Sequence, residues 1–112
     1  MKLYGIPNCD TVKKARNWLD KHNLDYDFHD FRKDGVDEAL ISQWIAELGW
    51  EQIVNKRSTS WRNLPDDTKA SMNAVLAIQE VMTQPTLIKR PVLQTKQNLV
   101  IGFNDKTYQE LL

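Results

Sequence analysis

Residues 2–31 show a strand pattern, then a helix pattern, then a second strand pattern, and this order limits the folds that the chain can adopt. Residues 2–6 (KLYGI) form an apolar and aromatic run closed by Pro7, which is typical of a strand. Residues 10–23 place apolar side chains at helical spacing and predict an amphipathic helix. Residues 25–31 (DYDFHDF) alternate aromatic and acidic side chains and predict a second strand. Because these two strands flank a helix, we expect them to be parallel in one sheet.

The rest of the chain adds helices and then strands. Residues 37–49 and 71–84 predict helices, and the polar, basic stretch between them is the least regular part, with a helix-start signal at Asn63 and Pro65. After residue 84 we expect a strand, a kink at Arg90-Pro91, a hairpin and a short helix capped by Asn104 or Asp105; these occupy residues 86–89, 92–95, 99–102 and 103–112.

This order of elements predicts one α/β domain over residues 1–112. Its centre is a mixed four-stranded sheet, and the middle helices form an insertion at about 35–84. A chain of 112 residues fits one domain and buries a core large enough to fold without disulfide bonds.

Composition narrows the function classes. The chain has one cysteine, so no disulfide forms within it, and a lone thiol suits a reducing cytoplasm. Lys plus Arg and Asp plus Glu both count 15, and this balance favours neither nucleic acid nor an anionic membrane as a partner. The start (MKLYGIPNCD) has no apolar signal region, and no apolar stretch is long enough for a membrane span. We expect a cytoplasmic monomer.

Cys9 falls where the first strand ends and the first helix begins. The first backbone N–H groups of a helix have no acceptor within it, and together with the helix dipole they favour a thiolate at this position. The alternative is a small buried core residue, but polar Asn8 and Asp10 suit a loop and a cap better than a core. Residue 12 is Val, so there is no CxxC pair, and a mixed disulfide on Cys9 needs an outside thiol for release. Glutathione is the cytosolic candidate.

Two basic segments contain arginines that could stabilise the Cys9 thiolate or bind an anionic substrate. Arg57 and Arg62 lie in NKRSTSWR, and Arg90 precedes Pro91 in KRP. Guanidinium groups bind carboxylates and oxyanions in a bidentate way. If Arg57 and Arg90 converge on Cys9, they stabilise the thiolate and hold an anionic substrate; taken singly, each is a common surface residue. On base rates alone the Arg90-Pro91 bond is trans. No Cys/His cluster has metal-ligand spacing, so we predict no metal.

Three segments in order, YGIPNCDTVKKARNWL, NKRSTSWR and PTLIKRPVL, resemble the arsenate-reductase-like family, which includes glutaredoxin-dependent arsenate reductases and the Spx regulators. The sequence looks closest to the YffB-type branch. The resemblance implies a thioredoxin-like fold, a cis bond at Arg90-Pro91 facing the cysteine, and Cys9 as nucleophile. It matches Arg57 and Arg90 to two arginines that the reductases place around the oxyanion.

The sequence also departs from the reductases. Where they carry a His before the cysteine and a Ser after it, this chain has Gly5 and Val12, and a third arginine is replaced by the neighbourhood GFND. Spx switches carry a CxxC pair that is missing here. The resemblance therefore favours a monothiol, glutathione-dependent thiol reductase. The alternatives are an Spx-like regulator that binds RNA polymerase without catalysis, and an arsenate reductase that uses glutathione and glutaredoxin.

The resulting site prediction makes Cys9 catalytic, with glutathione as cosubstrate and a small thiol or oxyanion as substrate. The predicted substrate-binding residues are Asn8, Asp10, Thr11, Arg57, Arg62, Arg90 and Pro91.

Overall fold

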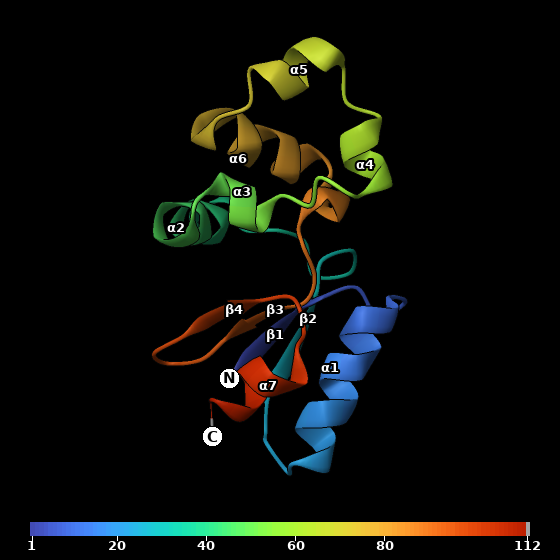
Figure 1. Ribbon diagram of the computed structural model, residues 1–112, viewed down its shortest axis with the longest axis vertical. Coiled ribbons are helices and arrows are strands. Elements are labelled where there is room, and N and C mark those ends of the chain that lie inside the picture. Colours follow the sequence, from blue (N-terminus) through green and yellow to red (C-terminus); the bar gives the residue numbers. More distant parts are fainter. Residues whose placement is uncertain (112) are drawn as a thin grey trace. The chain divides into compact units, whose positions relative to one another are not determined.

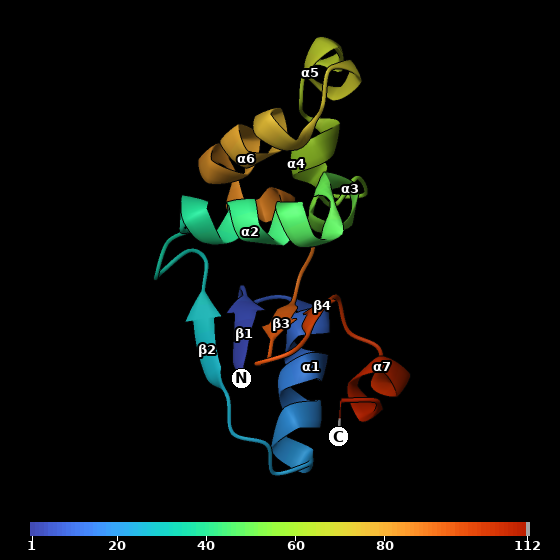
Figure 2. The same cartoon turned by 90° about the vertical axis from the view of Figure 1, so that its left-hand side faces the viewer.

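Strand β1 (Lys2–Gly5) lies inside a four-stranded sheet in the order β2-β1-β3-β4, as Figures 1 and 2 show. The computed structural model describes residues 1–111 and divides the chain into two units. The sheet unit comprises Met1–Gly35 and the residues from Arg90 onward, and the helical unit comprises Val36–Lys89. Residues 36–84 of the expected insertion fall in the helical unit, which continues to Lys89.

The sheet is mixed, as the sequence predicts. β1 pairs in parallel with β2 (Asp27–Asp30), and the helix α1 (Asp10–Lys21) connects them. β3 (Val92–Gln94) runs antiparallel to β1, and β4 (Leu99–Ile101) antiparallel to β3. The α/β class and the parallel start of the sheet are confirmed.

One face of this sheet carries the core of the sheet unit. Leu3 and Leu93 are register partners on β1 and β3. They pack in one buried cluster with Trp18 and Leu19 of α1 and with Tyr108 of α7 (Asp105–Gln109). The cap of α7 is Asn104, whose side chain accepts from the backbone N–H groups of residues 106 and 107, so the open choice between two caps resolves to Asn104. Helices α1 and α7 thus cover the same face.

The helical unit has two longer helices and several short ones. Their bounds are α2 (Glu38–Leu48), α3 (Trp50–Ile53), α4 (Thr59–Arg62), α5 (Asp66–Ala70), α6 (Ala74–Thr83) and the 3-10 helix η1 (Pro85–Leu87). Asp37 caps α2 by accepting from the backbone N–H of Ala39, and Asn73 caps α6 by accepting from that of Leu76. The stretch that looks irregular in sequence therefore contains three short helices, α3 to α5.

Of the expectations for residues 85–91, the strand over 86–89 is wrong and the cis bond implied by the resemblance is confirmed. Residues 86–89 do not form a strand: Pro85 begins η1, and Ile88 makes only an isolated bridge to Val54. The Arg90-Pro91 bond is cis, as the family resemblance implies and against the base-rate expectation.

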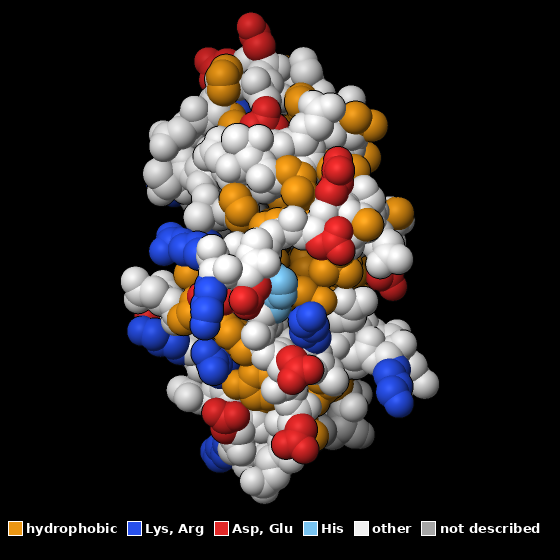
Figure 3. Space-filling view, turned by 180° about the vertical axis from the view of Figure 1, so that it is seen from behind, with side chains coloured by type: hydrophobic (Ala, Val, Ile, Leu, Met, Phe, Trp, Pro, Cys, Tyr) orange, Lys and Arg blue, Asp and Glu red, His pale blue; other side chains and the backbone are white. Residues whose placement is uncertain are grey.

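The surface mixes both signs of charge. Figure 3 shows Lys and Arg side chains interspersed with Asp and Glu side chains on the face that it displays. None of the helices in residues 1–111 combines the length and the apolar character that crossing a membrane requires.

Candidate functional site

Cys9 occupies the N-cap of α1. Its backbone is extended, with φ −140° and ψ 124°, and its carbonyl accepts the first helical hydrogen bond from the N–H of Lys13 at 2.9 Å. The Cys9 side chain makes no capping hydrogen bond to the first turn. Cys9 is a free thiol and is half-buried. The N-terminal amides of a helix carry partial positive charge, and the Cys9 sulfur beside them is partly exposed.

The residues beside Cys9 are also accessible. Asn8 and Asp10 are exposed, and Thr11 is half-buried in the first turn of α1. These three residues are neighbours of Cys9 in sequence, and their side chains are at least partly exposed to solvent. Their predicted role in substrate binding stays a prediction.

Gly5 and Val12 pack against each other next to this loop. A Cβ built on Gly5 would lie 2.8 Å from Cγ2 of Val12, closer than side-chain carbons approach. Val12 is fully buried. The two positions at which the sequence departs from the arsenate reductases are therefore in contact: a side chain at position 5 needs the space that Val12 fills.

Arg90 and Pro91 lie at the end of the sheet from which the Cys9 loop departs. Tyr4 pairs with Val92, so Pro91 follows in register toward Gly5, the last residue of β1. The Pro91 carbonyl accepts from the N–H of Gly102 at 2.8 Å, which fixes this turn to the end of β4. Arg90 is half-buried and Pro91 is buried. Both predicted residues thus share a sheet end with the thiol loop.

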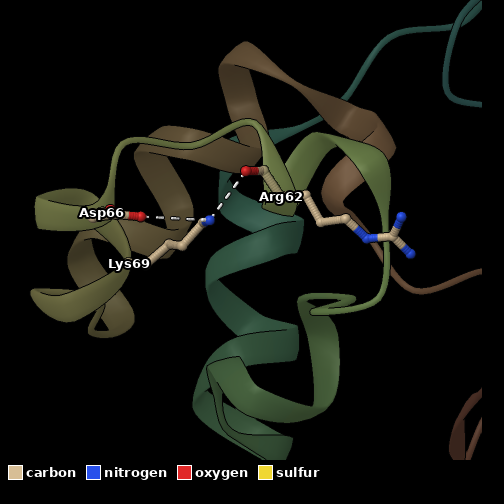
Figure 4. A network of polar contacts seen from close by, with 3 residues as sticks. All are labelled: Arg62, Asp66 and Lys69. Carbon is tan, nitrogen blue, oxygen red and sulfur yellow. Dashed lines mark hydrogen bonds and ion pairs between the residues drawn. The ribbon is translucent and has the colours of Figure 1, made fainter.

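Arg57 and Arg62 belong to the helical unit. The N–H of Arg57 donates to Oδ1 of Asn55 at 3.0 Å, and its carbonyl accepts from Nη2 of Arg62 at 3.0 Å. In Figure 4 the Arg62 side chain extends away from Asp66 and Lys69, while its own carbonyl accepts from Nζ of Lys69 at 3.0 Å. Arg62 thus supports the backbone at Arg57. Convergence of Arg57 on Cys9 stays a prediction.

Sequence reasoning did not select the cations beside Arg57 for the site. Nζ of Lys56 lies 5.0 Å from the ring centre of Trp50 and 5.9 Å from that of Trp61, and the two rings are stacked. Lys56, Arg57 and Lys89 line a cavity of about 330 Å³ with one acid, Glu51. The signal was present in sequence as basic residues between two tryptophans, but the pairing of Trp50 with Trp61 depends on the fold of α3 and α4.

The model of the ArsC family matches residues 4–111. The chain belongs to the ArsC family. A solved structure described as the YFFB (PA3664) protein superposes with a TM-score of 0.94 at 42% identity, covering 97% of this chain and 96% of that one. The sheet unit and helical insertion are therefore the thioredoxin-like fold of this family, and the likeness to the YffB-type branch is confirmed.

Two other relatives are similar to this chain over nearly its whole length. An uncharacterised protein of Haemophilus influenzae is 48% identical over 107 residues, covering 96% of this chain and 94% of its own. The global transcriptional regulator Spx of Streptococcus pyogenes is 30% identical over 112 residues, covering 98% of this chain and 83% of its own. A protein named as a transcriptional regulator is thus among the relatives of this chain.

Proposed function

We propose that this ArsC-family protein is a monothiol, glutathione-dependent thiol reductase with Cys9 as its nucleophile. One observation supports the proposal: Cys9 is the half-buried N-cap of a twelve-residue helix, and its side chain makes no capping hydrogen bond. Reactive cysteines occupy such positions because the amides stabilise the thiolate.

The reaction is a pair of thiol–disulfide exchanges. The Cys9 thiolate attacks one sulfur of a substrate disulfide, forms a mixed disulfide with it and releases the other sulfur as a thiolate, which takes a proton. The glutathione thiolate then attacks the substrate sulfur of the mixed disulfide and releases Cys9. The products are a glutathione–substrate disulfide and a free thiol, so the substrate disulfide is exchanged at the expense of one glutathione.

Arg90 and the exposed loop residues are the groups of the sheet unit that can hold the substrate. The Arg90 guanidinium offers bidentate donors for a glutathione carboxylate, and it lies at the same end of the sheet as Cys9. Asn8 and Thr11 offer uncharged hydrogen-bonding groups beside the thiol. The cytoplasm, with its glutathione pool, is the compartment that this chemistry requires.

The experiment is a glutathionylation cycle followed by mass spectrometry. Glutathione disulfide is added to the reduced protein, and we expect one glutathionyl group on Cys9 that excess reduced glutathione removes. Cys9→Ser is the control and should remain unmodified. Iodoacetamide should also react faster at pH 7 with the native protein than with the same protein in urea. Absence of an adduct, or a native thiol slower than the unfolded one, would contradict the proposal.

A second function is favoured by the Spx relative. An Spx-like regulator would bind RNA polymerase through its surface without using the thiol. That function predicts co-purification with RNA polymerase that persists in Cys9→Ala. If the complex forms and no glutathione adduct does, the regulator replaces the reductase as the proposed function.

Arsenate reduction is the least supported of the three. The contact between Gly5 and Val12 fills the space in which the reductases carry His and Ser, and only Arg90 of the predicted oxyanion-binding arginines lies in the sheet unit with Cys9. We therefore expect no turnover of arsenate with glutathione and glutaredoxin. Measurable turnover that Arg90→Ala abolishes would contradict this assignment.

A further inference from the structure

The basic cavity of the helical unit contains cations that have no part in the predicted thiol site. Its volume is about 330 Å³, and its charged lining residues, all of them exposed, are Glu51, Lys56, Arg57 and Lys89. In residues 1–111 the one ion pair joins Lys69 to Asp66, so the four charged groups of the cavity form no ion pair with one another. The cavity therefore has three cations that no carboxylate of the described residues neutralises.

Hydrogen bonds between two segments remote in sequence bring these cations to one cavity. The N–H of Asn55 donates to the carbonyl of Leu87 at 2.8 Å, and the N–H of Lys89 donates to the carbonyl of Ile53 at 2.7 Å. Lys89 thus lies opposite Ile53 at one end of this short pairing, while Arg57 follows Asn55 at its other end. The positive charges of the cavity are therefore spread over two ends and are not gathered at one point.

The segment that carries Lys56 and Arg57 is also held in place. The N–H of Arg57 donates to Oδ1 of Asn55 at 3.0 Å. Nζ of Lys56 lies 5.0 Å from the ring centre of Trp50 and 5.9 Å from that of Trp61, within the range of cation–π attraction. Because these contacts already restrict the segment, an anion that binds there orders less of the chain, which favours binding.

The size and the charges of the cavity together select a class of ligand. Its volume lies at the lower end of the range for small organic ligands. The Arg57 guanidinium offers two parallel donors to a carboxylate, and the Lys89 ammonium is a point charge for a second one. Since both side chains are exposed, each contact is weak and screened by salt, so a ligand that makes both of them binds better than one that makes either alone.

We propose that this cavity of the helical unit binds a small aliphatic dicarboxylate, with one carboxylate on Arg57 and the other on Lys89. Lys56 adds positive potential, and Glu51 opposes binding through its like charge. The site shares Arg57 with the predicted reductase site, but it needs neither Cys9 nor the reaction of the thiol, so it is independent of the proposed reductase activity.

The test uses a matched pair of probes, glutarate and glutaramate, which have the same length and differ in one carboxylate. Each is titrated by NMR into the full ¹⁵N-labelled chain at constant, low ionic strength. We expect saturable shifts of the Arg57 and Lys89 amides and of the Trp50 and Trp61 indole N–H groups. Glutarate should bind about threefold to fivefold more tightly than glutaramate, the upper range of one exposed ion pair, and added salt should reduce this difference.

Two variants with the same change in net charge form the matched control. Lys89→Gln removes a cation of the cavity, and its affinity for glutarate should fall to about that for glutaramate. Lys96→Gln removes an exposed cation from the turn between β3 and β4 in the sheet unit, and it should bind both probes as the unmodified chain does. Glu51→Gln removes the like charge and should bind glutarate more tightly. Cys9→Ser should bind both probes unchanged.

Three results would each overturn the proposal. They are shifts that never saturate, equal affinity of the unmodified chain for glutarate and glutaramate, and equal affinity of Lys89→Gln and Lys96→Gln for glutarate. The last of these would mean that glutarate responds only to the net charge of the chain. A chain that takes up no glutathione but binds glutarate as described would contradict the proposed reductase and leave this site in place.

Discussion

At the scale of single residues, the Tyr108 hydroxyl is the clearest energetic cost in the sheet unit. Leaving a buried hydroxyl without a partner costs about 1–3 kcal/mol, and replacing Tyr by Phe removes that cost while keeping the ring packed. We expect Tyr108→Phe to raise the free energy of unfolding by about 1 kcal/mol. Urea denaturation followed by circular dichroism measures the change.

Tyr26→Phe serves as the control for that stability prediction. The Tyr26 hydroxyl accepts from Nε of Arg16 at 3.2 Å, so its removal should lower the free energy of unfolding by about 0.5–1 kcal/mol. If Tyr108→Phe is the less stable of the two variants, the Tyr108 hydroxyl has a partner.

The same residue predicts a dependence on pH. Burial raises the pKa of Tyr108 above its ordinary value, so the folded state keeps the proton while the unfolded state loses it above about pH 10. The unfolded state then binds fewer protons, and the stability that this group contributes falls as pH rises, by up to about 1.4 kcal/mol per pH unit. The stability advantage of Tyr108→Phe should therefore be larger at pH 11 than at pH 9. Equal advantages at both pH values would contradict the assignment.

At the scale of elements, β1 packs against α1 through the contact between Gly5 and Val12. Gly5→Ala places a methyl carbon 2.8 Å from Cγ2 of Val12, and overpacking of this kind costs about 1–3 kcal/mol. Val12→Ala opens the space, so the double variant should be destabilised by less than the sum of the two single variants, by about 1 kcal/mol. Urea denaturation of all four proteins gives the coupling.

Val81 provides the control for that cycle, because it is fully buried in α6 of the helical unit. Gly5→Ala combined with Val81→Ala should be additive, since the two positions belong to different units. Additivity in the Gly5–Val12 pair as well would show that β1 shifts to accept the methyl group, and the packing argument would fail.

The elements with a strong local signal could be predicted from sequence. The apolar period fixes α1, α2 and α6, and Asp37, Asn73 and Asn104 mark helix starts by residue type. Residues 86–89 could not be predicted correctly, because their apolar run suits a strand but only Ile88 finds a bridge partner. Helices as short as α3 and α4 have too few residues to show a period.

Some residues of the candidate site could likewise be predicted from sequence and others could not. Cys9 could be placed at its cap because strand, loop and helix are consecutive in sequence, and the structure has it as the N-cap. Arg90 could be assigned to the same sheet end only once β3 was paired with β1. The stacking of Trp50 with Trp61 around Lys56 depends on contacts between two helices, which no local pattern specifies.

At the scale of the whole molecule, the residues predicted for the reductase are divided between the two units. The sheet unit contains Cys9 and Arg90, and the helical unit contains Arg57, which lines a basic cavity of that unit. In residues 1–111 the one ion pair joins Lys69 to Asp66, so the Arg57 guanidinium forms no ion pair with a carboxylate of these residues. Its backbone is held by Asn55 and Arg62, which leaves the side chain available for an anion.

The family resemblance predicts that Arg57 acts on the reaction of Cys9 with glutathione disulfide. A hydrogen bond to a charged group contributes about 1.5 kcal/mol or more, so Arg57→Ala should slow glutathionylation about tenfold, with circular dichroism unchanged. The glutathionylation rate of Arg57→Lys should lie between those of the unmodified chain and Arg57→Ala, because lysine keeps the charge and loses the bidentate geometry. Arg32→Ala, an exposed arginine after β2, is the control and should react as the unmodified chain does. If Arg57→Ala and Arg32→Ala react at equal rates, glutathione is held by the sheet unit alone, and the predicted role of Arg57 is wrong.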